Sequence, residues 1–204
     1  MDDDGRAEGP EEVQQLVNAT WTVAARIGSF EPSVRDILQE AGISTKAFYR
    51  HFRSKDELLL MALEEGSTRI ADYLESKMAA FDNPLHRISA WIDSFVRHSV
   101  APPEPNRLPL TLGVLGVGRL ANVYPAQFDH SRSSVIAPLE REIARAVAAG
   151  TAHSPSPVKD ARIVFGYTMD AIRIQRANGT EPNAATIGQL IDFTYRALGA
   201  TPPE

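Results

Sequence analysis

Cysteine is absent from this 204-residue chain, which excludes a disulfide-bonded scaffold and metal sites built from thiolates. A long apolar run is also absent. The most apolar window, residues 108–126, carries Arg119, three glycines and two prolines, which indicates a buried or cavity-lining helix rather than a membrane span. No apolar stretch follows a basic start at the N-terminus, so we expect no signal peptide and a cytoplasmic protein.

Motifs for catalysis or cofactor binding are missing as well. The five histidines, at positions 51, 86, 98, 130 and 153, form no i, i+4 pair suited to a metal. The glycines of residues 113–118 (GVLGVG) follow no predicted strand and lack the order of a phosphate-binding loop. No GxSxG nucleophile motif occurs. The sequence therefore predicts no enzymatic activity, no metal site and no cofactor.

Apolar residues recur at helical spacing, and no strand-like alternation of useful length interrupts them. After four N-terminal helices, the last of which runs to about residue 80, the predicted helices span residues 84–100, 107–123, 125–149, 156–178 and 183–199. Pro138 should kink or split the helix that contains it. The pattern predicts an all-α protein with a small N-terminal bundle and a larger C-terminal one.

The formal net charge of −5 conceals a local positive patch. Residues 1–12 hold six acidic residues and one basic residue, so they account for the whole net charge. Residues 44–55 contain four Lys or Arg residues and His51, and no acidic residue. Such a charge run is usually a solvated face, so its meaning depends on the geometry of the helices that carry it.

Capping signals divide the patch and the residues before it into short helices. The first helix should stop at Gly28. Ser33, with Asp36 three residues later, is suited to begin a helix that ends at Gly42. Ser44 can begin the next helix, and Ser54 with Glu57 a long fourth one. Two short helices joined through Ala41, Gly42 and Ile43 predict a helix-turn-helix.

The second of these short helices is rich in hydrogen-bond donors. It should bury Phe48 and Phe52 and expose the opposite side, which carries Thr45, Lys46, Tyr49 and Arg50. A helix of this kind fits the major groove of DNA, which is about 12 Å wide.

From Val13 to Leu63 the sequence resembles the TetR family of bacterial transcriptional repressors, above all in AGIS (41–44), in the cluster of Tyr49, His51 and Phe52, and in SKDEL (54–58). The resemblance implies a homodimer that binds a palindromic DNA operator. It also implies a pocket in the C-terminal bundle for a small apolar or amphipathic effector that controls DNA affinity.

The resemblance also assigns roles to residues. Tyr49, His51, Lys55 and Ser33 fall on phosphate-contacting positions, and Thr45 and Lys46 on base-facing ones. The predicted DNA-binding set is Ser33, Ser44, Thr45, Lys46, Tyr49, Arg50, His51 and Lys55. Lys46, Ala47 and Leu38 depart from the common family pattern, so no operator sequence can be transferred. Packing roles for Tyr49 and His51, and simple solvation of Lys55, remain alternatives.

The predicted ligand-binding set is Trp91, Phe95, Leu112, Leu115, Arg119, Tyr124, Phe128, Phe165 and Met169. For the aromatic residues and Met169 a core role is the alternative. Arg119 interrupts an apolar segment and must meet water or an anionic partner, so it is the candidate polar anchor. Asp170 and Arg173 also follow an apolar run, and the alternative for them is a simple pair across their helix.

We thus predict a disordered acidic arm at residues 1–10, a helix-turn-helix DNA-binding domain at 11–54, and a helical ligand-binding and dimerisation domain at 55–204. Two apolar stripes are candidates for a four-helix dimer interface; they comprise Val158, Phe165, Met169 and Ile172, and Ile187, Leu190, Ile191, Thr194 and Leu198. The alternative function is a small-molecule-binding or adaptor protein that keeps the helix-turn-helix only as a packing module.

Overall fold

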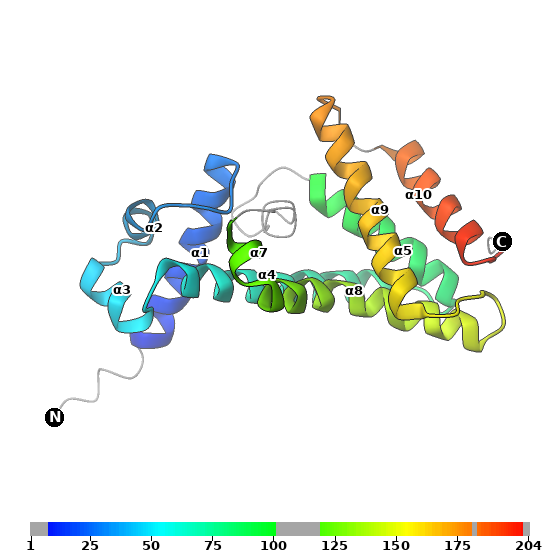
Figure 1. Ribbon diagram of the computed structural model, residues 1–204, viewed down its shortest axis with the longest axis horizontal. Coiled ribbons are helices and arrows are strands. Elements are labelled where there is room, and N and C mark those ends of the chain that lie inside the picture. The colour runs from blue at the N-terminus through cyan, green and yellow to red at the C-terminus, as the bar shows by residue number, and fades with distance from the viewer. Residues whose placement is uncertain (1–7, 101–118, 181–182, 202–204) are drawn as a thin grey trace. The chain divides into compact units, whose positions relative to one another are not determined.

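The computed structural model describes residues 8–100, 119–180 and 183–201, and within these ranges the chain is helical and has no strand (Figure 1). The helices are α1 (Glu8–Ile27), α2 (Val34–Ala41), α3 (Thr45–His51), α4 (Lys55–Met78), α5 (Pro84–Val100), α7 (Arg119–Val123), α8 (Pro125–Ala148), α9 (Pro157–Ala177) and α10 (Ala184–Ala197). The predicted all-α fold, with an N-terminal three-helix domain and a larger C-terminal helical domain, is confirmed.

The described residues form two compact units. The first contains residues 8–67 and 119–131, and the second contains residues 68–100, 132–180 and 183–201. Helices α4 and α8 each contribute residues to both units. The predicted domain boundary between residues 54 and 55 therefore falls inside the first unit, because the start of α4, α7 and the start of α8 pack with the N-terminal helices.

The core of the first unit explains why α1 to α4 fold together. Leu16 and Val17 of α1, Ile37 of α2, Phe48 of α3 and Leu58 of α4 are all fully buried in one apolar cluster. Burying a side chain of this size contributes about 1.5–3 kcal/mol. Each helix supplies an apolar face that only its neighbours can cover.

The predicted caps are confirmed. Gly28 and Gly42 have φ values of 66° and 67°, a left-handed conformation that glycine adopts without a steric penalty. The hydroxyl oxygens of Ser33 and Ser44 accept the backbone N–H groups of Asp36 and Ala47 at 3.1 and 3.2 Å. Ser54 likewise caps α4 by accepting the Glu57 N–H at 3.2 Å.

In the second unit, α5, α9 and α10 pack against one another (Figure 1). The rings of Trp91 and Phe95 stack with centroids 4.8 Å apart, and Phe165 contacts both at an angle. The buried hydroxyl of Tyr195 donates to the Leu85 carbonyl at 2.8 Å and accepts from Ser89. Burial raises the pKa of the Tyr195 hydroxyl.

Two expectations about the helices need correction, and a third lies mostly outside the described residues. Helix α1 begins at Glu8, so residues 8–10 of the predicted arm are helical; Pro10 is tolerated there because the first turn needs no backbone donor. Helix α8 continues through Pro138 as one helix, so it is not split. Only Arg119–Val123 of the predicted helix 107–123 is described, as α7, and residues 107–118 lie outside the described residues.

The predicted dimer stripes also need correction, because most of their residues are buried within the protomer. In α9 these are Phe165, Met169 and Ile172; in α10 they are Ile187, Leu190, Thr194 and Leu198. Both helices pack on α5, which covers these faces. Of the predicted stripes, Val158 is exposed. The other exposed large apolar side chains of these helices lie off the stripes: Ile163, Tyr167 and Ile174 of α9, and Phe193 of α10.

Candidate nucleic-acid interface

Helices α2 and α3 form the predicted helix-turn-helix, and buried aromatic rings fix the orientation of α3. Phe48 and Phe52 are 0% and 2% exposed, and their ring centroids lie 5.7 Å apart. Ala47 is buried beside them. Partly buried Ile43 packs against the same core from the turn. With this side inward, the polar side of α3 must face outward.

The outward side carries most of the predicted DNA-binding residues. Ser33, Ser44, Thr45, Lys46, Tyr49 and Arg50 are exposed, and His51 and Lys55 are partly buried. Tyr49 is 60% exposed, although the edge of its ring contacts Phe48. The Tyr49 side chain thus lies mostly in solvent, whereas the His51 side chain is only 15% exposed and is partly packed.

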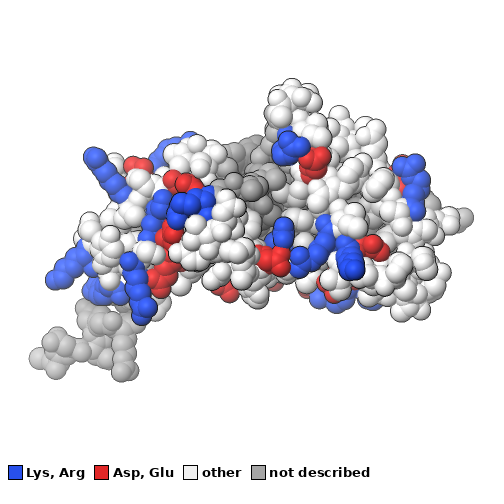
Figure 2. Space-filling model, viewed as in Figure 1, with Lys and Arg blue, Asp and Glu red and all other residues white. Residues whose placement is uncertain are grey.

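A shallow hollow lies over α3, with a volume of about 410 Å³, lined by Ser44, Lys46, Ala47, Tyr49 and Arg50. The ammonium group, the guanidinium and the phenol hydroxyl around it all donate hydrogen bonds. Figure 2 shows Lys and Arg side chains spread over the N-terminal helices, with a few acidic groups among them. This surface can therefore bind an anionic, acceptor-rich ligand.

Glu12 of α1 is an unexpected member of this surface. Its carboxylate accepts two contacts from Arg50 Nη2, at 3.1 and 3.0 Å, and lies 2.5 Å from His51 Nε2. Since a carboxylate only accepts, the His51 ring must carry a hydrogen on Nε2. The hydrogen bond from His51, together with the charge of Arg50, lowers the pKa of Glu12.

No pattern in the sequence indicated this pairing. Glu12 stands 38 residues before Arg50, among the many acidic residues of the N-terminal stretch. The contact depends on how α1 crosses α3, which no local pattern specifies.

A second ion pair connects α7 to the first turn of α4. Both terminal nitrogens of Arg119 donate to the carboxylate of Asp56, one of them at 2.9 Å, and the Arg119 backbone N–H donates to Glu31 at 3.2 Å. The hydrogen bond from Arg119 lowers the pKa of Asp56, and the same bond raises that of Arg119. Asp56 directly follows Lys55, so this pair adjoins a predicted phosphate-contacting residue.

Of the two possibilities for Arg119, water or an anionic partner, the structure shows the second, a carboxylate of its own unit. With its side chain 47% exposed and bonded to Asp56, Arg119 lies at the surface, and its prediction as the ligand anchor is wrong. Asp170 and Arg173, the other charged pair in an apolar helix, bond to each other at 2.6 Å, which was the alternative for them.

The remaining predicted ligand-binding residues divide between the two units. Tyr124 and Phe128 pack against the core of the first unit. Trp91, Phe95, Phe165 and Met169 are buried in the second unit. Leu112 and Leu115 lie outside the described residues. The contacts among the three rings of the second unit agree with the core role that was the alternative for them.

Among the described residues, no group of three His, Cys, Asp or Glu side chains is arranged to hold a metal ion. No helix in the described part of the chain is both long and apolar enough to cross a membrane.

Comparison with known proteins agrees with this geometry. Residues 16–62, which contain α2, α3 and the start of α4, match the family described as bacterial regulatory proteins, tetR family. Residues 16–62 therefore carry the DNA-binding segment of the TetR family of bacterial regulatory proteins.

Two curated relatives, both HTH-type transcriptional regulators, differ in how much of the chain they match. The HTH-type transcriptional regulator PksA of Bacillus subtilis (strain 168) is 34% identical over 62 residues, 30% of each chain. The HTH-type transcriptional regulator BetI of Brucella anthropi is 24% identical over 185 residues, 88% of this chain and 89% of BetI. The match to PksA thus spans less than a third of that regulator.

The solved structure of RolR in complex with resorcinol has the same fold, with a TM-score of 0.69. It is 16% identical to this chain, and the match covers 95% of this chain and 90% of RolR. At this identity the likeness shows a shared fold alone and transfers no ligand.

Proposed function

We propose that this TetR-family chain binds a palindromic DNA operator as a homodimer and represses transcription until a small amphipathic effector releases it. The observation that carries the proposal is helix α3, which buries Phe48 and Phe52 and presents Thr45, Lys46 and Tyr49 to solvent. An exposed helix of donors on a rigid apolar base suits the major groove, where donors meet base edges and phosphates together.

In this proposal the exposed residues have two roles. Tyr49, His51, Lys55 and Ser33 bind phosphates and fix the position of α3, whereas Thr45 and Lys46 contact base edges. Ser44 and Arg50 flank them on the same surface. The hydroxyl of Ser33 donates to Asp36 at 2.6 Å in the free protein, so a phosphate would have to replace that bond.

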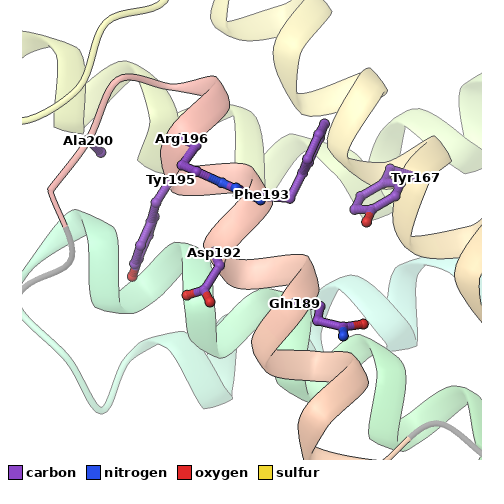
Figure 3. Close-up of a pocket in the computed structure, with 7 residues that line it drawn as sticks. All are labelled: Tyr167, Gln189, Asp192, Phe193, Tyr195, Arg196 and Ala200. Carbon is purple, nitrogen blue, oxygen red and sulfur yellow. The ribbon is translucent and has the colours of Figure 1, made fainter.

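The homodimer would form through the exposed apolar face of α9 and α10. Ile163, Tyr167 and Ile174, at spacings of four and seven, lie on one side of α9 and are 61%, 39% and 45% exposed. Phe193 of α10 joins them, with its ring centroid 4.5 Å from that of Tyr167 (Figure 3). Two such faces related by a two-fold axis bury each other, as isologous interfaces do.

A pocket of about 480 Å³ adjoins this face and is lined by Tyr167, Gln189, Asp192, Phe193, Tyr195, Arg196 and Ala200 (Figure 3). Its exposed aromatic rings, with charged Asp192 and Arg196 beside them, have the mixed character of a protein interface. A side chain of the second protomer would fit this hollow.

The effector would bind within the second unit. RolR, which shares the fold, binds resorcinol. In this chain the apolar wall of such a site would be the ring cluster of Trp91, Phe95 and Phe165, which requires the cluster to open when the effector enters. Arg119 is left out of this site because it is bonded to Asp56.

A gel-shift experiment with DNA flanking the chain's own gene tests the proposal. We expect a discrete complex that resists competition by mixed-sequence DNA and weakens as salt rises. Failure to bind either DNA at low salt would overturn the proposal and leave the alternative, a small-molecule-binding or adaptor protein that retains the helix-turn-helix as a packing module.

A further inference from the structure

We infer that Glu12 is a specificity-determining residue, which occupies the cations of the recognition helix α3 in the free protein and so suppresses binding to DNA of arbitrary sequence. The inference rests on the proposed DNA-binding function. It arises from a contact between α1 and α3 that the proposed roles of the DNA-binding residues do not use.

The carboxylate of Glu12 uses the donors that a phosphate would need. Arg50 Nη2 donates to its two oxygens, Oε1 and Oε2, at 3.1 and 3.0 Å, and His51 Nε2 lies 2.5 Å from Oε2. A carboxylate and a phosphate accept hydrogen bonds from Arg in the same way. While Glu12 holds this position, a phosphate can reach these donors only by displacing it.

Burial makes the contact persistent. The side chains of Glu12 and His51 are 23% and 15% exposed, whereas that of Arg50 is 60% exposed. Arg50 can therefore turn from Glu12 to a phosphate without breaking the core. His51 can reach a phosphate with Nε2 only if it releases Glu12.

The charge of Glu12 has a second effect at this surface. A carboxylate beside the expected phosphate path repels the DNA backbone wherever the duplex docks. Cognate DNA can offset this cost through base contacts from Thr45 and Lys46, but arbitrary DNA cannot. Glu12 should therefore weaken arbitrary binding more than cognate binding, which makes it a determinant of specificity.

The test measures binding by fluorescence anisotropy to two duplexes, one of mixed sequence and one from the DNA upstream of the chain's own gene. Glu12→Gln removes the charge and preserves the side-chain volume, and Glu12→Ala removes the acceptor entirely. Glu11→Gln is the matched control, because Glu11 is exposed on the adjacent position of α1 and loses the same charge.

We expect both Glu12 variants to bind the mixed-sequence duplex about three- to tenfold more tightly than wild type at about 50 mM salt. The slope of log affinity against log salt should steepen by roughly 0.9 for each additional phosphate that the protein neutralises. The increase in affinity for the upstream duplex should be smaller. Glu11→Gln should change both affinities by less than about twofold, since the Glu11 side chain is exposed and solvent screens its charge more than that of partly buried Glu12. In an Arg50→Ala background, removal of Glu12 should have much less effect.

Equal effects of Glu11→Gln and Glu12→Gln would overturn the inference, because the result would then be a general charge effect. Weaker binding by both Glu12 variants, with unchanged thermal midpoints, would overturn it as well, because Glu12 would then assist DNA binding. Wild-type protein that binds neither duplex would instead overturn the proposed function itself.

Discussion

Replacement of Glu142 should destabilise the second unit much more than replacement of a charged residue at its surface. The carboxylate of Glu142 is 1% exposed, lies 3.0 Å from Arg87 Nε and accepts a hydrogen bond from Arg145 Nη1 at 2.7 Å. The Arg87 contact is an ion pair whose N–H is not aligned for a hydrogen bond. Glu142 thus connects α8 to α5 from a buried position.

The magnitude follows from what Glu142→Ala leaves behind. Breaking a buried pair by removing one partner typically costs about 3–5 kcal/mol. Here the side chains of Arg87 and Arg145 are 20% and 50% exposed, so both can recover some hydration. We therefore expect a loss of roughly 2–3 kcal/mol, or a shift of about 1–1.5 M in the urea midpoint for a slope near 2 kcal/mol per molar.

Urea unfolding of the full chain, followed by circular dichroism at one fixed protein concentration, measures this loss. Arg141→Ala is the control, because its pair with Glu75 is about half exposed on both sides and should contribute less than about 1 kcal/mol. Equal midpoint shifts for the two variants would refute the reasoning that burial sets the cost.

Three further predictions concern the surfaces. The bond from Arg119 lowers the pKa of Asp56 from its ordinary value of 3.8, so the pair stabilises the fold above that pH and less as pH falls through the lowered pKa. The urea midpoints of wild type and Asp56→Asn should therefore converge in acid. A difference between the midpoints that does not depend on pH would contradict this. Tyr167→Glu with Phe193→Glu should give a monomer near 22.3 kDa in sedimentation, whereas Ile27→Glu, an exposed change in α1, should leave the dimer intact; a dimer from the double variant would exclude this face. Tyr49→Phe should weaken cognate and mixed-sequence DNA equally and modestly, and a loss confined to cognate DNA would instead indicate a base contact.

The helix-turn-helix was predictable because its signals are local. Ser33, Gly42 and Ser44 specify where two helices begin and end, and each acts through backbone groups only a few residues away. The apolar spacing of Phe48 and Phe52 then fixes which side of α3 faces inward. Sequence separation is short in every one of these interactions.

The ion pairs of the first unit were not predictable in the same way. Arg119 and Asp56 are 63 residues apart, so the sequence indicated that Arg119 must meet water or an anionic partner but could not identify Asp56. The same holds for Glu12 and its two partners on α3. Such pairings depend on how distant helices cross.

Periodicity also failed to separate the protomer core from the exposed apolar face. Phe165 belongs to the apolar stripe of α9 and Leu190 to that of α10, and both are buried within the protomer. Tyr167 and Phe193 lie off those stripes and remain exposed. An apolar stripe predicts that a helix face is covered, and it does not tell whether the same chain or a second copy covers it.

The central claim, that α3 binds a specific DNA sequence, is tested most directly by comparing Lys46→Ala with Lys55→Ala on operator and mixed-sequence DNA over a range of salt. We predict that Lys55→Ala weakens both alike and flattens the salt dependence by roughly 0.9 for each phosphate that is no longer neutralised. Lys46→Ala should cost about 1–3 kcal/mol per half-site on the operator alone. Unchanged operator affinity in both variants at physiological salt would contradict the account.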